Sequence, residues 1–106
     1  MKTRMRKCGE WTEFALIGNV QSGADLDPES GQFFVHVANR TLEQLGLEIF
    51  EAVDGPDSSR WIALAGTTRI CFEYDDMVGT TIKVSGPDQQ HGEQVVYALQ
   101  GALDAL

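Results

Sequence analysis

The stretch Arg60–Ser85, RWIALAGTTRICFEYDDMVGTTIKVS, carries the clearest secondary-structure pattern in this chain. It contains three short runs rich in β-branched, aromatic and aliphatic residues, and a glycine marks each break between them. Over positions 70–75 of the middle run, apolar residues alternate with a cysteine and two acids. Successive side chains of a strand point to opposite faces, so this alternation predicts a sheet with one buried face. The stretch is therefore predicted to be a β-meander.

Two further strands are predicted on the N-terminal side of the meander. Trp11–Val20 has aromatic and aliphatic residues on both faces, as in a strand that is covered on two sides. Gln32–Ala38 has alternating apolar side chains and is predicted to pair with Trp11–Val20 as a hairpin. The residues between them, Gln21–Gly31, combine glycines, a proline and carboxylates without periodicity, which indicates a long loop.

A helix is predicted to begin at Thr41, because T-x-x-Q over positions 41–44 has the spacing of a capping box. Apolar residues then recur at helical spacing as far as Val53, and a Gly-Pro pair follows shortly afterwards. One helix over residues 41–53 is the preferred interpretation.

An alternative interpretation of the same residues stays open. Gly46 can end a short helix, because glycine readily adopts the left-handed conformation found at helix C-termini. Leu47–Val53 then forms an extra strand that pairs with Arg60–Ala65.

A second helix is predicted after the meander, with Ser85 or Asp88 at its N-terminus and one apolar stripe along its length. The predicted order of elements is therefore β-β-α-β-β-β-α. Helices segregated from an antiparallel sheet make an α+β fold, here a two-layer sandwich of about five strands and two helices. We expect a single domain over residues 9–106. Residues 1–8, which lack apolar periodicity, are expected to form a flexible basic arm.

The charge balance constrains the class of partner. Sixteen acidic residues against eight basic ones give a formal net charge of −8, and four of the eight bases lie in the first seven residues. Such a surface repels nucleic acid and anionic membranes and attracts basic proteins over long distances. The sequence contains no apolar run of the roughly 18 residues that a membrane span requires. We expect a cytoplasmic protein that binds neither nucleic acid nor membranes directly.

No complete catalytic or metal-binding motif is present. Asp25, Asp27 and Glu29 alternate like the first three ligands of a calcium loop, but Ser30 and His36 replace the glycine and the glutamate that such a loop needs. The cysteines and histidines do not have the spacing of zinc ligands, and no glycine-rich phosphate loop precedes a helix. We therefore expect no metal and no cofactor, and a non-enzymatic protein is favoured over an enzyme.

Acidic residues beside an aromatic one are the candidate partner-binding residues. One group lies at the end of the central strand and in the turn after it, and the other lies in the Gln21–Gly31 loop. A tryptophan near such a turn has the character of an interface anchor. The candidates are Glu73, Asp75, Asp76 and Trp61, together with Asp25, Asp27 and Glu29.

Three hypotheses of function follow from these observations. The first is a small acidic interaction module that binds a protein with a basic surface and modulates or inhibits it. The second is a ligand-binding domain or small enzyme with a pocket between sheet and helices. The third is a structural subunit that forms a homodimer through a free sheet edge or a helix face.

Overall fold

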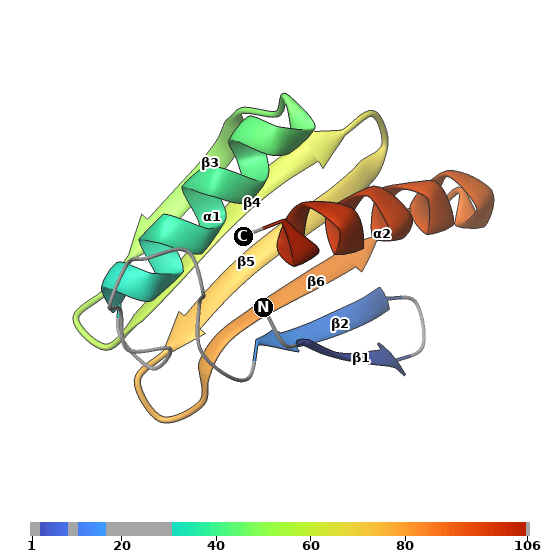
Figure 1. Cartoon of the computed structure of the whole chain (residues 1–106). Helices are drawn as coiled ribbons and strands as arrows, with labels where there is room; N and C mark the ends of the chain where they lie inside the picture. Colours follow the sequence, from blue (N-terminus) through green and yellow to red (C-terminus); the bar gives the residue numbers. More distant parts are fainter. Residues whose placement is uncertain (1–2, 9–10, 17–30, 106) are drawn as a thin grey trace.

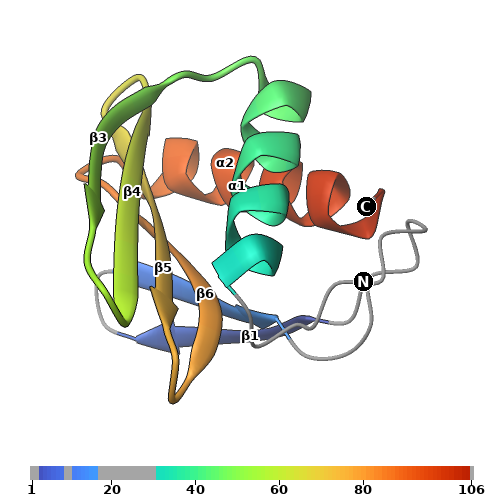
Figure 2. The ribbon, with the colours of Figure 1, turned by 90° about the vertical axis from the view of Figure 1, so that its left-hand side faces the viewer.

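The computed structural model describes residues 3–8, 11–16 and 31–105, and these form one six-stranded sheet and two helices. Every neighbouring pair of strands is antiparallel, and the strand order is β1-β2-β6-β5-β4-β3. Both helices lie on one face of the sheet (Figures 1 and 2). The predicted α+β sandwich of two layers is confirmed. The elements are β1 (Thr3–Cys8), β2 (Trp11–Leu16), α1 (Gly31–Leu45), β3 (Ile49–Asp54), β4 (Ser58–Ala65), β5 (Thr68–Asp75), β6 (Gly79–Ser85) and α2 (Gln89–Asp104).

The core lies between the helices and the covered face of the sheet. The predicted period of two holds in β5 and β6, where Phe72 lies opposite Ile82 and both side chains are fully buried. The helices contribute the other half of the core with side chains that leave less than a tenth of their surface exposed. Burial of this kind stabilises a fold by about 1.5–3 kcal/mol for each large apolar side chain. These helical residues are Phe33, Phe34, Val37, Ala38, Leu42, Val95, Leu99, Ala102 and Leu103.

The prediction of a strand over Gln32–Ala38 is wrong, because these residues form the first half of α1. Their apolar side chains come in adjacent pairs that recur every four residues, at positions 33 and 34 and again at 37 and 38. The buried pair at 41 and 42 continues this spacing. A helix gathers such pairs on one stripe, whereas a strand would divide each pair between its two faces.

Gly46 ends α1, so the preferred single helix over residues 41–53 is wrong and the alternative is correct. Gly46 has a φ of +67°. The N–H of Leu47 donates to the carbonyl of Leu42 at 2.9 Å, and the N–H of Gly46 donates to that of Glu43 at 3.2 Å. These two bonds are those of a Schellman motif, which requires a left-handed residue at this position. Beyond it β3 pairs with β4, with a bulge near its start.

Thr41 was predicted to cap a helix, but it lies in the interior of α1 with none of its surface exposed. In α2 the prediction is confirmed, because Asp88 is the N-cap and its carboxylate accepts the N–H of His91 at 3.1 Å. A carboxylate at this position also interacts favourably with the positive end of the helix.

The N-terminal residues differ from the predicted arm, because Thr3–Cys8 pairs with β2 along all six positions. Pairing at a sheet edge satisfies backbone groups and needs no apolar periodicity, which is why the sequence pattern did not indicate it. With β1 and β3 gained, and the predicted strand Gln32–Ala38 found to be helical, the sheet has six strands. β2 covers the first six residues of the predicted strand Trp11–Val20. The rest of that strand, and the predicted loop up to residue 30, lie outside the described residues.

The hairpin of β1 and β2 is joined to the meander of β3–β6 by the pairing of β2 with β6. In the part of the chain that the structure describes, neither helix is long and apolar enough to cross a membrane.

Candidate functional site

Two turns meet at one end of the sheet and together form the candidate site, which we call the acidic turn pair: Asp54–Ser58 and Asp75–Gly79. Alternate turns of a meander lie at the same end, and the figures show these two side by side (Figures 1 and 2). The backbone N–H of Asp76 donates to the carbonyl of Asp57 at 3.0 Å. This bond joins two segments that lie about twenty residues apart in the sequence.

The acidic turn pair combines negative charge with exposed apolar side chains. Asp54, Asp57, Asp75 and Asp76 are all exposed, and the two turns contain no lysine or arginine. Met77 and the neighbouring Val78 expose 88% and 73% of their surface, although apolar side chains of this size are usually buried. The carboxylates of such a surface can attract basic groups, and its apolar side chains can be buried by contact with another molecule.

Hydrogen bonds within each turn fix its conformation. The carboxylate of Asp75 accepts the N–H of Met77 at 2.8 Å, and the carbonyl of Asp75 accepts the N–H of Val78 at 3.1 Å. In the other turn, the N–H of Gly55 donates to the carbonyl of Ser58 at 2.7 Å. Because the turns are held in this way, a partner that binds them need not offset the entropy of ordering a loop.

Trp61 lies behind the turn pair and does not project from it. Its ring is half-buried against the edge of the Phe34 ring, with 5.2 Å between the centroids and 73° between the planes. Its indole N–H donates to the carboxylate of Asp54 at 2.9 Å. The tryptophan therefore connects the core to the acidic turn pair and orients one of its four carboxylates.

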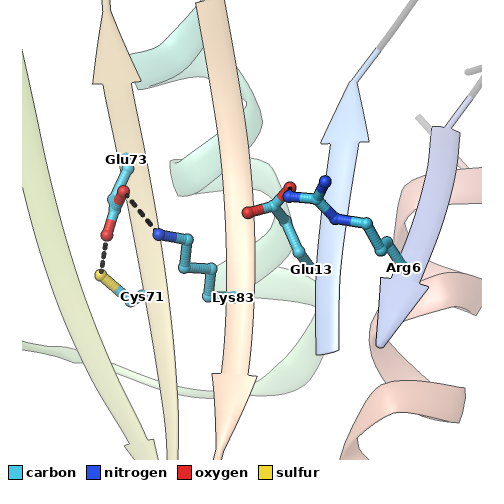
Figure 3. A network of polar contacts seen from close by, with 5 residues as sticks. All are labelled: Arg6, Glu13, Cys71, Glu73 and Lys83. Atoms are coloured by element: carbon cyan, nitrogen blue, oxygen red, sulfur yellow. Dashed lines mark hydrogen bonds and ion pairs between the residues drawn. The ribbon is translucent and has the colours of Figure 1, made fainter. Parts of the chain in front are cut away.

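Glu73 lies next to the turn pair on the open face of the sheet, the face that the helices do not cover. Its carboxylate lies 3.3 Å from the ammonium group of Lys83, and on neighbouring strands Arg6 pairs with Glu13 at 2.9 Å. Figure 3 shows these charged side chains in a row across the sheet. A hollow of about 670 Å³ lies between this row and the two turns. The two ion pairs line it together with one further base and one further acid, Arg60 and Asp75, so the lining contributes little net charge for a ligand.

The Cys71 thiol belongs to the same row and is not activated. Burial first, and then the negative charge of Glu73 and the hydrogen bond that the thiol donates to its carboxylate at 3.4 Å, together raise the pKa of Cys71 to about 11. A nucleophilic cysteine needs the opposite environment, because the thiolate is the reactive form. Among residues 3–8, 11–16 and 31–105, no three histidine, cysteine or acidic side chains are grouped so that they could hold a metal ion.

The structure brings together only some of the residues that the sequence predicted. Asp75 and Asp76 are in the turn pair, with Glu73 beside it and Trp61 behind it. Asp25, Asp27 and Glu29 lie outside the described residues. Sequence reasoning missed Asp54 and Asp57, because only the meander topology places the two turns together, and it missed the apolar pair at positions 77 and 78. The signal for that pair was present as two apolar residues inside a turn rather than in a strand.

A second hollow, of about 810 Å³, lies between β1, β2 and the start of α2. Its lining includes Met5, Lys7, Pro87, Glu93 and Val96.

Comparisons with protein-family models, curated proteins and solved structures found no match to this chain.

Proposed function

We propose that the protein is a small, non-enzymatic interaction module that binds a protein with a basic surface through the acidic turn pair, and thereby modulates or inhibits that protein. The observation that carries the proposal is the bond between Asp76 and Asp57. It holds four exposed carboxylates and two exposed apolar side chains at the same end of the sheet.

Charge and apolar surface contribute differently to such binding. The carboxylates attract a basic partner before contact and so raise the association rate. Met77 and Val78 leave water only on contact, so they slow dissociation. Since four backbone N–H groups of the two turns are already hydrogen-bonded, little ordering opposes the complex.

The proposal is tested by capturing partners from host lysate and then measuring the binding kinetics of the purified partner. Reversal of two charges in the variant Asp75→Lys/Asp76→Lys should lower the association rate at least tenfold, or about 1.4 kcal/mol, and change the dissociation rate much less. The association rate of the unaltered protein should also fall as salt increases to about 0.15 M, where the Debye length is about 8 Å.

The matched control is Glu43→Lys/Glu93→Lys, which makes the same change in net charge at exposed positions on the helices. Binding that is insensitive to salt and to the turn reversal contradicts the proposal. An equal loss in the control and the turn variant also contradicts it, because binding would then depend on net charge and not on this site. Met77→Ala/Val78→Ala should raise mainly the dissociation rate.

A further inference from the structure

The two edges of the sheet have opposite charge. β1 and β3 lie at the opposite ends of the strand order, and each is six residues long. β1, TRMRKC, contains three bases and no acid, whereas β3, IFEAVD, contains two acids and no base. An edge strand presents backbone N–H and C=O groups that can pair with another strand. The opposite charges indicate which other strand each edge would accept.

The directions of the strands allow the two edges to pair with each other. All six strands alternate in direction, so β1 and β3 are antiparallel (Figure 1). A second copy placed beside β3, with its helices on the same side, therefore presents its β1 in the antiparallel direction. The resulting sheet continues the pattern already present within each copy.

The open face of the sheet supports the same arrangement. A row of paired positions crosses all six strands, and it runs in order through Arg6, Glu13, Lys83, Cys71, Ile62 and Glu51. The row thus begins with a base at one edge and ends with an acid at the other. Because open-face residues pair with open-face residues, a continuing sheet can place Arg4 or Arg6 directly opposite Glu51, and the other base is then diagonal to it.

Exposed apolar side chains lie along both edges as well. Phe50 and Val53 of β3 expose 68% and 51% of their surface, and Met5 of β1 exposes 56%. Large apolar side chains grouped on an edge strand favour its coverage by another strand.

We propose that copies of this chain associate head to tail, with β1 of one copy paired to β3 of the next, so that their sheets become continuous. Pairing of β3 with a second β3 would bring acids together, and pairing of β1 with β1 would bring bases together. Charged residues on an edge strand normally oppose its pairing with other strands. In this protein the charges oppose the pairing of β1 with β1 and of β3 with β3, but not that of β1 with β3. The bulge between Ile49 and Glu51 limits the regular contact to Glu51–Asp54. A contact of this size makes the association weak, reversible and repeatable, since each copy leaves one edge free.

The proposal is tested by sedimentation velocity of the full chain over a dilution series at two salt concentrations. Association should be strong in about 0.01 M salt, where the Debye length is about 30 Å, and weak in about 0.15 M salt, where it is about 8 Å. The variants Arg4→Glu and Glu51→Lys should each weaken association at least tenfold, about 1.4 kcal/mol. The two changes combined in one chain should restore it to within about threefold, because the exchanged charges attract again.

Matched controls make the same charge changes on the helices, with Arg40→Glu on α1 and Glu93→Lys on α2, and should leave association unchanged. Circular dichroism checks that each variant folds, and Arg4→Gln and Glu51→Gln replace any reversal that does not. A chain that remains monomeric at all concentrations in low salt overturns the proposal. Association that Arg4→Glu leaves unchanged also overturns it, because a contact between two β3 strands or two helix faces would behave in that way.

Discussion

The two faces of the sheet are built from the same strands and have opposite character. In β5, Ile70 and Phe72 face the helices and have none of their surface exposed, while Cys71 and Glu73, which alternate with them, face outward in the row of polar side chains. Successive residues of the strand therefore alternate between the face that packs against the helices and the face that is exposed to solvent. We infer that the covered face determines the free energy of unfolding, whereas the open face and the turns determine electrostatics and binding.

The largest expected effect comes from the covered face. The substitution Phe72→Ala should lower the free energy of unfolding by about 3–5 kcal/mol, because it removes a fully buried ring and leaves a cavity. Urea denaturation measures the loss. The control Arg69→Ala, at an exposed position of the same strand, should change stability by no more than about 0.5 kcal/mol. Equal losses in the two variants would refute the distinction between the faces.

A smaller effect of opposite sign is expected from Thr41, a polar residue in the apolar layer. Its side chain is fully buried, and its hydroxyl has no hydrogen-bond partner among residues 3–8, 11–16 and 31–105. Replacement by valine keeps the shape and removes the unpaired group, so Thr41→Val should raise the free energy of unfolding by about 1 kcal/mol. Thr41→Ser, which keeps the hydroxyl and loses the methyl group, should lower it. A destabilised valine variant would show that the hydroxyl contributes to the fold.

The smallest expected effect is a change in the pKa of the Cys71 thiol, which can be observed only at high pH. Its pKa is raised to about 11 by burial first and by Glu73 second. Glu73→Gln should therefore lower the pKa, which should still stay above the ordinary value of 9.0 because burial remains. Titration of thiolate absorbance measures both values. An unchanged pKa in the variant would mean that Glu73 does not act on the thiol.

The same raised pKa predicts how stability varies with pH. The unfolded chain loses the Cys71 proton near pH 9.0 and the folded chain near pH 11, so the free energy of unfolding should fall as the pH rises through this interval. Below pH 9.0 the contribution of the protonated Cys71 thiol to the free energy of unfolding is fully present. Other groups also titrate at high pH, so the measured quantity is the difference between the protein and Cys71→Ala. That difference should diminish from pH 9 to pH 11.

The part of the fold that the sequence predicted correctly is the part in which one periodicity dominates. In β5 and β6 large apolar residues occupy every second position, and no helical stripe competes with that pattern. In α1 the apolar pairs fit both the strand period of two and the helical period when only a few residues are considered. The spacing that continues through Thr41 and Leu42 fits a helix and not a strand. A pattern that is considered only as far as Ala38 therefore favours a strand, although these residues form a helix.

The candidate site was predictable to a smaller extent, for a different reason. Asp75 and Asp76 could be selected because acidic residues next to each other are visible in the sequence. Their association with Asp54 and Asp57 depends on how β3 pairs with β4, and β3 is free to form because Gly46 ends the preceding helix. Sites built from separate turns require the strand register, which short-range sequence patterns do not contain.

The pairing of β2 with β6 has a consequence for the order in which the protein assembles. The pairs β3–β4, β4–β5 and β5–β6 join neighbours along the chain and require short loop closures, whereas the pair β2–β6 joins strands that are far apart in the sequence. β1 and β2 leave the ribosome before β3–β6, so β2 cannot pair with β6 until the strands between them in the sequence have been synthesised. During synthesis the basic edge and the acidic edge therefore do not belong to one sheet until β6 has been made.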